Sequence, residues 1–564
     1  MMDFKMRAKG ISIPSTKAWG MKRVSLGLVA VGLLAGLGLP AISPSAQAEE
    51  LVLEKIERPL VAAEIHGPIF AKIHPLWHQD SPGITGAAED WDEFGDALTW
   101  GDFNGDGLND LAIGVPHEDI GAIQSAGAVN VLYGSNTGLS AFGNQIWHQN
   151  SPGIAGGAEQ GDRFGSALAS GDFNRDGFDD LAVGVPGEDI GAIQSAGAVN
   201  VLYGSNVGLS SAGNRIWHQN SPGIVDGAES WDHFGDALAV GDFDEDRFDD
   251  LAVGVPGEDI GAIQSAGAVN VMYGSNSGLA SAGNQIWHQN SAGIAGEAEA
   301  WDRFGDALAA GDFDGDHFDD LAVGVPGEAI GTITSAGAVN VIYGMGAGLS
   351  SAGDQIWHQN SPGIVDGAES WDKFGDALAA GDFNGDDCDD LAIGVLGESI
   401  GDIGSVPGEE FPRGGAGAVN VIYGAANGLS SAGNQIWSQN SPGIAGVSEP
   451  GDCFGASLAA GDMNGDGYVD LAIGVPLEDI GAIANAGAVN TLRGSAFGLT
   501  AAGNQLYHQD SPGMVDIAEV GDQFGNALSM GDFNGNGNSD LAIGVPLEDI
   551  GAIINCGAVN VMYF

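Results

Sequence analysis

Basic residues and cysteines are scarce in this chain. With 17 Lys and Arg against 76 Asp and Glu, the formal net charge is −59 at pH 7. Such a chain repels phosphate, which excludes nucleic acid as a partner and disfavours anionic membranes, whereas multivalent cations would relieve its self-repulsion. The three cysteines, Cys388, Cys453 and Cys556, form no CxxC pair and are odd in number, so no complete disulfide framework is expected.

Long apolar runs are confined to the N-terminus. Residues 26–39 are apolar but too short for a typical membrane span; they follow Met21-Lys22-Arg23 and precede the small-x-small sequence Ala46-Gln47-Ala48. This pattern predicts a signal peptide over residues 1–48, with Met21 as an alternative start. We therefore expect an exported monomer, either secreted, periplasmic or at the cell surface, with no membrane span in the mature chain.

Aromatic residues are few, at 7%, whereas glycine is abundant, with 95 residues. A unit that contains the stretch GDFNGDGLNDLAIGVP recurs seven times, at intervals of 70 residues except for one of 80. Each unit holds four short β-like runs separated by turn residues, and no long helical pattern competes with them. The sequence therefore predicts an all-β fold, a seven-bladed β-propeller of four-stranded blades over residues 74–564. Residues 49–73 match no repeat and are expected to be a linker or a strap along the propeller edge.

The units also predict how the ring closes. The seventh unit stops in its third strand at residues 561–564, without the Trp-His-Gln strand that ends the other units. A spare copy of that strand, LWHQ at residues 76–79, precedes the first unit. We expect this N-terminal strand to complete the last blade and close the propeller.

An acidic loop in each unit offers hard oxygen ligands. Loop positions 1, 3, 5 and 9 carry Asp or Asn, and position 7 would add its backbone carbonyl; Ca²⁺ prefers such a set. An EF-hand would need a bidentate Glu at position 12, but Ile113 and its counterparts are apolar, so the loop is predicted to be a β-hairpin between the first two strands of a blade. The predicted ligands, site by site, are Asp102, Asn104, Asp106, Leu108, Asp110; Asp172, Asn174, Asp176, Phe178, Asp180; Asp242, Asp244, Asp246, Phe248, Asp250; Asp312, Asp314, Asp316, Phe318, Asp320; Asp382, Asn384, Asp386, Cys388, Asp390; Asp462, Asn464, Asp466, Tyr468, Asp470; and Asp532, Asn534, Asn536, Asn538, Asp540.

The seven sites differ in charge. Up to seven Ca²⁺ ions are expected, one per blade. The third and fourth sites have four carboxylates each, whereas the seventh has only Asp532 and Asp540 and is expected to be the weakest. If position 6 requires a left-handed backbone, Arg247 and His317 carry a strain cost there. The sequence leaves open whether the ions only stabilise the blades or also serve a ligand.

These motifs resemble the FG-GAP repeat family, which includes the propeller of integrin α subunits and many bacterial exported proteins. The match comprises Phe94-Gly95, the Asp102–Asp110 loop and Gly114-Val115-Pro116, repeated seven times. The resemblance implies a propeller with Ca²⁺ in the hairpins of one face and ligands on the opposite face, where loops such as residues 118–121 and 151–154 would lie. The family also includes a lectin and the non-catalytic propeller of a GPI-cleaving phospholipase D.

Three further patterns could serve either the fold or a ligand. The Trp-His-Gln strands could bind sugars or wedge between blades. The Asp two residues before each Phe-Gly could accept backbone N–H groups or face a ligand near the axis. The Glu-Asp pairs after Gly-x-Pro could form an acidic ring, although a solvated rim is favoured. These residues are His78, His148, His218, His288, His358 and His508; Asp92, Asp162, Asp232, Asp302, Asp372, Asp452 and Asp522; and Glu118/Asp119, Glu188/Asp189, Glu258/Asp259, Glu478/Asp479 and Glu548/Asp549.

One insertion breaks the symmetry. The fifth unit gains ten residues within residues 402–417, DIGSVPGEEFPRGGAG, in a loop on the expected ligand face. Glu409, Phe411 and Arg413 combine charge with an aromatic ring and are candidate ligand-binding residues, because unique loops on rigid scaffolds often carry function. Neutral drift is the alternative.

No enzyme is expected. The sequence has no HExxH, GxSxG or P-loop motif in a convincing context, and repeated units do not supply the unique constellation of an active site. The leading hypothesis is an exported calcium-binding β-propeller that acts as a binding or adhesion module for an unidentified protein or glycan. The alternatives are a multivalent lectin with sugar pockets between blades, a hydrolase or lyase that uses the central channel, and a non-catalytic partner of a hydrolase such as a phospholipase.

Overall fold

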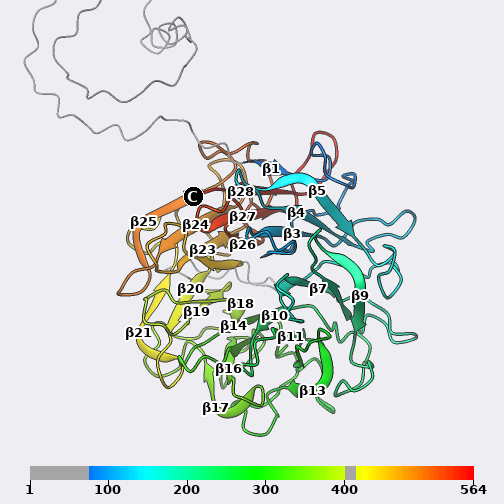
Figure 1. Cartoon of the computed structure of the whole chain (residues 1–564). Helices are drawn as coiled ribbons and strands as arrows, with labels where there is room; N and C mark the ends of the chain where they lie inside the picture. The colour runs from blue at the N-terminus through cyan, green and yellow to red at the C-terminus, as the bar shows by residue number, and fades with distance from the viewer. Residues whose placement is uncertain (1–74, 400–414) are drawn as a thin grey trace, which may run out of the picture. The chain divides into compact units, whose positions relative to one another are not determined.

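The computed structural model describes residues 75–399 and 415–564, and every regular element within these ranges is a β-strand. The strands form seven four-stranded antiparallel sheets around a ring (Figure 1), which confirms the predicted seven-bladed β-propeller. The first blade consists of β2 (Leu98–Gly101), β3 (Asp110–Val115), β4 (Ala128–Tyr133) and β5 (Ser140–Trp147). The next five blades are β6 (Leu168–Gly171), β7 (Asp180–Val185), β8 (Ala198–Tyr203), β9 (Ser210–Trp217); β10 (Leu238–Gly241), β11 (Asp250–Val255), β12 (Ala268–Tyr273), β13 (Ala280–Trp287); β14 (Leu308–Gly311), β15 (Asp320–Val325), β16 (Ala338–Tyr343), β17 (Ser350–Trp357); β18 (Phe374–Gly381), β19 (Asp390–Val395), β20 (Ala418–Tyr423), β21 (Ser430–Trp437); and β22 (Leu458–Gly461), β23 (Asp470–Val475), β24 (Ala488–Arg493), β25 (Thr500–Tyr507).

The seventh blade joins the two ends of the described chain. Its strands are β26 (Leu528–Gly531), β27 (Asp540–Val545), β28 (Ala558–Met562) and, as the fourth strand, β1 (Leu76–Trp77). β1 pairs antiparallel with β28, with Leu76 opposite Asn560 and Trp77 opposite Val559. The predicted closure by the N-terminal strand is therefore confirmed.

The core lies between the blades. The second and third strands, such as β3 and β4, are buried along their whole length because each blade packs against a neighbour on either side. A Cβ on Gly114 would stand only 2.2 Å from the carbonyl oxygen of Gly165 in the next blade. The strand-2 glycine of one blade thus accommodates the Phe-Gly turn of the next, which explains why these two motifs recur together.

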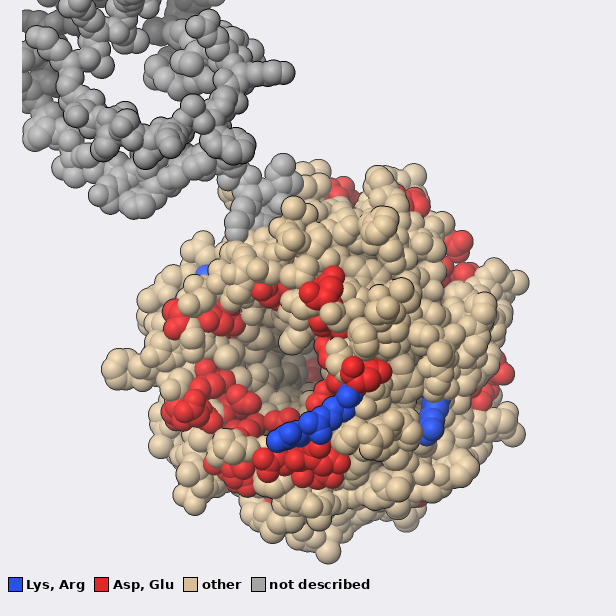
Figure 2. Space-filling model, in the orientation of Figure 1, with Lys and Arg blue, Asp and Glu red and all other residues tan. Residues whose placement is uncertain are grey.

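Each blade has two different ends. Because the strands alternate in direction, the hairpins between first and second strands share one face, the hairpin face, with the turns between third and fourth strands. The loops between second and third strands and the links between blades form the opposite face, the connection face. Acidic side chains gather around the mouth of the ring on the side seen in Figure 2, with few basic ones.

The narrow part of the axis is apolar. A cavity of about 270 Å³ is lined by an Ala-Leu pair at the start of the first strand of each blade, such as Ala97 and Leu98, with Ser457 in place of the alanine in the sixth. In the part of the chain that the structure describes, no helix has the length and apolar character needed to cross a membrane.

Candidate metal hairpins and the connection face

The predicted ligand residues lie on a β-hairpin in every blade. In the first, the two carboxylate oxygens of Asp102 accept the backbone N–H groups of Asp106 and Gly107, at 3.0 and 2.8 Å. Asp110 is fully buried, and its Oδ2 accepts the backbone N–H of Phe103 at 3.0 Å. The first and last acidic residues therefore hold the turn in shape. Since each carboxylate oxygen has about two acceptor sites, these bonds leave capacity for a cation.

Two positions of the hairpin adopt a left-handed backbone. At position 6 the φ angle lies between 67° and 89° in all seven hairpins. It is 73° at Arg247 and 78° at His317, so these two residues have the left-handed backbone that the predicted strain requires. Position 4 is also left-handed, with φ of 56° at Arg175 and 55° at Glu245 and glycine in the other five hairpins. Position 4 was missed from the sequence, although its recurrent glycine is the signal for it.

Neighbouring hairpins contact each other around the ring. A Cβ on Gly105, at position 4, would stand 2.6 Å from the ring of Phe178, at position 7 of the next hairpin. Asp179, at position 8, accepts the backbone N–H of Asp102 at 2.7 Å. Side chains at position 8 make the same bond to the preceding hairpin at Asp249, Asp319, Asp389 and Asn109. No role was predicted for position 8, because the backbone N–H that its side chain binds lies in a different repeat.

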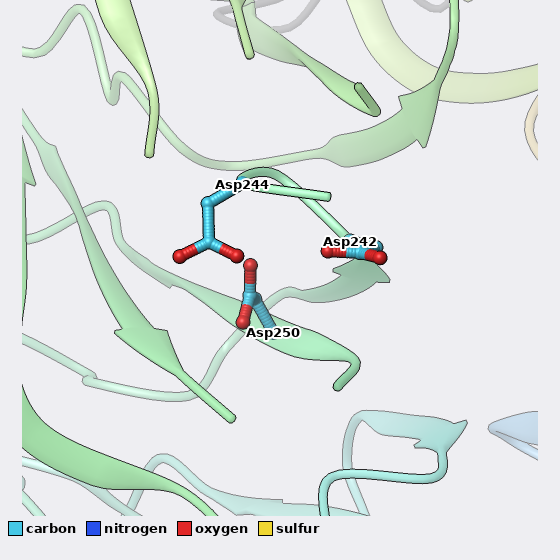
Figure 3. Close-up of side chains that lie close together, drawn as sticks. All are labelled: Asp242, Asp244 and Asp250. Carbon is cyan, nitrogen blue, oxygen red and sulfur yellow. The ribbon is translucent and has the colours of Figure 1, made fainter. Parts of the chain in front are cut away.

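The third and fourth hairpins each bring three carboxylates together. One oxygen each of Asp242, Asp244 and Asp250 lies within 4.8 Å of the others (Figure 3). The equivalent group in the fourth hairpin is Asp312, Asp314 and Asp320. In that hairpin Oδ1 of Asp314 is buried and has no hydrogen-bond partner. An unpartnered buried oxygen within a group of carboxylates fits a hard divalent cation such as Ca²⁺.

The other predicted ligands point less directly at one another. The position 5 carboxylate of Asp106 accepts the N–H of Leu108 at 3.0 Å. At position 3, the amide nitrogen of Asn104 lies 3.2 Å from a carboxylate oxygen of Asp110, and rotation of the amide by half a turn would present its oxygen instead. The Asn-containing hairpins therefore need this rotation to offer Ca²⁺ the predicted ligand set.

The last carboxylate of the hairpin is difficult to ionise without a cation. Burial, reinforced by the nearby charges of Asp106 and Asp102, raises the pKa of Asp110 to about 8, against the opposing effect of a backbone hydrogen bond from Gly134. Burial likewise raises to about 8 the pKa of Asp180, Asp250, Asp320 and Asp390. A bound divalent cation would keep such groups ionised.

The glutamates of the Glu-Asp pairs are not a solvated rim, so that prediction is wrong for them. Glu118 is buried, and its Oε2 accepts a hydrogen bond from Nε2 of Gln79 at 2.6 Å. The same Gln-to-Glu contact links each blade to the next in all seven positions. Burial raises the pKa of Glu118 to about 7 and that of Glu258 to about 9. Asp119, in contrast, is half-buried and accepts the backbone N–H of Ser125 at 2.9 Å.

The Trp-His-Gln strands mainly serve the fold. The glutamine makes the link just described, and Nε1 of Trp147 donates to Gln145 at 3.3 Å. The histidines are half-buried, and burial lowers the pKa of His148. Their Nδ1 atoms are buried without a hydrogen-bond partner at His78, His148, His218, His288, His358 and His508.

The Asp before each Phe-Gly accepts a backbone N–H, as one of its two interpretations predicts. Asp92 is buried, and its Oδ2 accepts the N–H of Glu89 at 2.5 Å. The other six blades repeat this bond. These carboxylates therefore shape the link between blades on the connection face.

Four exposed tryptophans on the connection face were missed from the sequence. Trp91, Trp231, Trp301 and Trp371 are 57, 58, 63 and 40% exposed, and their φ angles are 72–74°. The equivalent residue in the other three blades is Gly161, Gly451 or Gly521, also with positive φ. The signal in the sequence was the alternation of Trp with Gly at one fixed position.

Most of the insertion of the fifth blade lies outside the described residues. Residues 400–414, with Glu409, Phe411 and Arg413, lie outside the described residues, as do residues 1–74 with the predicted signal peptide and strap. A cavity of about 700 Å³ on the connection face is lined by described residues that include Trp371, Lys373 and Asp479.

Fold and site together define the class: a seven-bladed propeller with an acidic hairpin in every blade. The model of the FG-GAP repeat matches residues 94–132, 164–202, 234–272, 304–342, 374–421, 454–489 and 524–559. The chain belongs to the FG-GAP repeat family, as the resemblance predicted.

Two curated relatives illustrate the similarity. Phosphatidylinositol-glycan-specific phospholipase D of Rattus norvegicus is 35% identical over 164 residues, which cover 29% of this chain and 18% of that protein. Integrin alpha-5 of Xenopus laevis is 30% identical over 274 residues, 47% of this chain and 23% of that protein. The matches thus span less than a quarter of either relative. A solved structure described as the Dos1 propeller superposes with a TM-score of 0.42 at 12% identity, over 87% of this chain and 95% of that one, and carries no weight for function.

Proposed function

We propose that the protein is an exported calcium-binding propeller that acts as a binding or adhesion module for a protein or glycan, with its ligand on the connection face.

The proposal that the protein is exported rests on the signal-peptide pattern of residues 1–48. The N-terminal residue of the protein recovered outside the cytoplasm is expected to be Glu49, and an uncleaved N-terminus would contradict this part of the proposal.

In this proposal the hairpin carboxylates hold one Ca²⁺ per site, and the ion supplies the positive charge that keeps them ionised. The groups around Asp250 and Asp320 support it most directly, because their oxygens converge without an ion pair to a Lys or Arg. The contacts between neighbouring hairpins would then make the hairpin face rigid. A rigid scaffold favours precise presentation of residues on the opposite face.

The exposed tryptophans are the observation that carries the binding role. A non-glycine residue with a left-handed backbone costs about 1 kcal/mol or more. Glycine fills the same position in three blades, so the fold does not require a side chain there. Because Trp231 and Trp301 remain largely exposed, burial does not compensate for this cost. Exposed tryptophans of this kind are typical anchors for protein interfaces and for sugar rings.

We also propose that the propeller is not itself an enzyme. The narrow part of the axis, where a channel-based hydrolase or lyase would act, is lined by alanine and leucine with Ser457 as its one hydroxyl side chain among the described residues. General acid–base chemistry needs titratable groups within reach of the reacting atoms, and these residues offer none.

A binding screen with a matched variant tests the proposed ligand face. Labelled protein in Ca²⁺ is applied to arrays of glycans and of extracellular proteins, beside a variant in which Trp91, Trp231, Trp301 and Trp371 are replaced by Gly. Glycine already occupies this position in three blades, so the variant should fold. As a control, Phe142→Ala removes a 90% exposed aromatic ring from β5, where the second blade has Ala212.

We expect the fourfold variant to lose a ligand that the wild type and Phe142→Ala both retain. Equal binding by all three proteins, or no ligand of either class, would contradict the proposed face. Sugar binding that survives in the fourfold variant, with several equivalent sites, would instead favour the lectin alternative. The buried, unpartnered Nδ1 atoms of the Trp-His-Gln strands are the observation that supports that alternative.

A further inference from the structure

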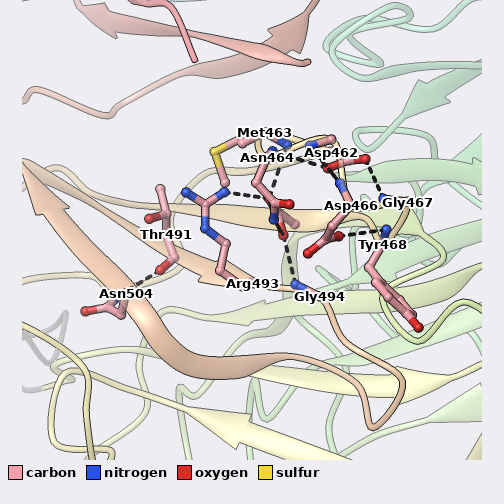
Figure 4. Close-up of polar contacts among 12 residues, drawn as sticks. Asp462, Met463, Asn464, Asp466, Gly467, Tyr468, Thr491, Arg493, Gly494 and Asn504 are labelled. Carbon is pink, nitrogen blue, oxygen red and sulfur yellow. Dashed lines mark hydrogen bonds and ion pairs between the residues drawn. The ribbon is translucent and has the colours of Figure 1, made fainter. Parts of the chain in front are cut away.

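The sixth hairpin carries a positive charge that the others lack. Arg493 ends β24 at a position where the other six blades have Tyr133, Tyr203, Tyr273, Tyr343, Tyr423 or Tyr563. Its Nη1 lies 2.6 Å from Oδ2 of Asp470, the fully buried last carboxylate of the hairpin. Figure 4 shows the guanidinium of Arg493 directed toward the hairpin residues Met463 and Asn464. Among the described residues, no other Lys or Arg lies within ion-pair distance of a hairpin carboxylate.

In other blades the tyrosine reaches into the next blade. The hydroxyl of Tyr423 accepts the backbone N–H of Leu499, in the turn before β25, at 3.0 Å. The same bond is made by Tyr133, Tyr273, Tyr343 and Tyr563. After the sixth blade comes the closing one, whose third and fourth strands, β28 and β1, come from opposite parts of the chain and are not joined by such a turn.

The side chain at position 493 therefore meets a different neighbour. The guanidinium carbon of Arg493 lies 6.0 Å from the centre of the Phe564 ring, within the range of a cation–π contact. The arginine thus packs at the closure of the ring while its charge is directed back to Asp470 within its own blade.

This arrangement does not fit a metal ion at the sixth hairpin. Oδ2 of Asp470 accepts hydrogen bonds from the N–H of Met463 at 3.1 Å and the amide of Asn464 at 3.2 Å, in addition to Arg493. Oδ1 accepts the N–H of Gly494 at 2.9 Å. The carboxylate is already paired and hydrogen-bonded, and a Ca²⁺ ion bound to it would stand beside a fixed positive charge with little water between them.

A second change is at position 8 of this hairpin, where the backbone N–H of Val469 still donates to the carbonyl of Asp382 at 3.1 Å but the side chain is apolar. Position 8 is Val469 in the sixth hairpin, so the side-chain bond to the N–H of the preceding position 1 residue, Asp382, is missing. Asp occupies position 8 in four of the other hairpins, so the sixth hairpin lacks this acidic side chain and has in addition gained an internal cation.

We infer that Arg493 replaces Ca²⁺ as the counter-charge of the sixth hairpin, so that this blade stays ordered without an ion and the ring binds one ion fewer than it has blades. The inference rests on the proposed calcium binding of the other hairpins. It also changes the ranking from the sequence, because the sixth site and not the seventh becomes the weakest.

Counting bound ions in matched variants tests the inference. Arg493→Tyr restores the residue of the other blades and is expected to bind one Ca²⁺ more than the wild type, measured by native mass spectrometry or by metal analysis after dialysis. Tyr423→Arg transfers the arginine to the fifth blade and is expected to bind one fewer. If the tyrosine variant does not fold, Arg493→Gln provides the same loss of charge with a similar side-chain length.

Replacement of Asp470 distinguishes a sixth hairpin that is neutralised by Arg493 from one that is neutralised by Ca²⁺. Asp470→Asn should leave the ion count of the wild type unchanged but should remove the ion gained by Arg493→Tyr.

Without Ca²⁺, Arg493→Tyr should unfold at a lower temperature than the wild type, and addition of Ca²⁺ should restore its unfolding temperature. An equal count in wild type and Arg493→Tyr, or an ion lost from the wild type on Asp470→Asn, overturns the role of Arg493. A wild type that binds no Ca²⁺ overturns the proposed function as well.

Discussion

Arg247 and Trp231 both hold a left-handed backbone where other blades have glycine. The two positions differ in what surrounds them. At the position of Arg247, a Cβ on Gly107 of the first hairpin would have nothing within 4 Å, so backbone strain alone should decide between residues there. At the position of Trp231 a large aromatic ring is left more than half exposed. We therefore attribute the strain at Trp231 to ligand binding and assign no such role to the strain at Arg247.

The strain at Arg247 can be measured by substitution. Arg247→Gly is expected to raise the free energy of unfolding by about 0.5–1 kcal/mol, because it removes the left-handed penalty but adds flexibility to the unfolded chain. Chemical denaturation in saturating Ca²⁺ measures it. The mirror variant Gly107→Arg should lose a similar amount, and two variants that shift stability in the same direction would contradict the assignment.

At the scale of the element, the sequence predicted what lies within one repeat better than what lies between repeats. The apolar residue at position 12, such as Ile113, correctly placed the acidic loop on a β-hairpin. The burial of Glu118 was not predicted, because its partner Gln79 belongs to the strand of another blade. The contact of Arg493 with the Phe564 ring was not predicted for a similar reason, because Phe564 belongs to the closing blade and not to the repeat of Arg493.

The buried Gln-to-Glu links predict a pH dependence. The pKa of Glu258 is raised from its usual range to about 9, by burial first and by Asp232 second. The folded state therefore holds this proton more tightly than the unfolded state does, and the stability it gives is complete at low pH and lost as the pH rises toward 9.

Glu258→Gln should mimic the protonated form. At pH 5, close to the ordinary pKa of glutamate, the variant and the wild type are expected to differ little in stability, whereas at pH 8 the variant should be more stable by at least about 1 kcal/mol. Urea unfolding at both pH values, with Ca²⁺ present, measures the difference. The exposed Glu297→Gln, which acts on no shifted carboxylate of this link, is the control and should show no such trend; an advantage of Glu258→Gln that is largest at pH 5 would refute the prediction.

At the scale of the whole molecule, the ring is held by closure and is opposed by charge. Among the described residues β1 alone covers the outer edge of β28, and Gln79 extends this contact to Glu118 in the first blade. The repeat period and the displaced LWHQ strand were enough to predict this architecture from the sequence. A formal net charge of −59 makes the same architecture dependent on bound cations in our account.

Removal of β1 should open the ring. A variant that lacks residues 1–79 is expected to unfold at a lower temperature than one that lacks residues 1–74 and to aggregate through the uncovered edge of β28. Thermal unfolding and light scattering measure both effects. A synthetic peptide of residues 75–90 should restore the midpoint in part; equal midpoints without the peptide would show that β1 does not close the ring.

The most direct test of the central claim is thermal unfolding of the purified propeller with and without Ca²⁺. A site filled at about 100 times its Kd contributes about 2.7 kcal/mol, so several hairpins together should raise the midpoint by about 10 °C or more in about 10 mM Ca²⁺ relative to EDTA. Mg²⁺ at the same concentration should not reproduce the shift, because it requires tighter octahedral geometry. An identical midpoint in Ca²⁺ and in EDTA would contradict the account.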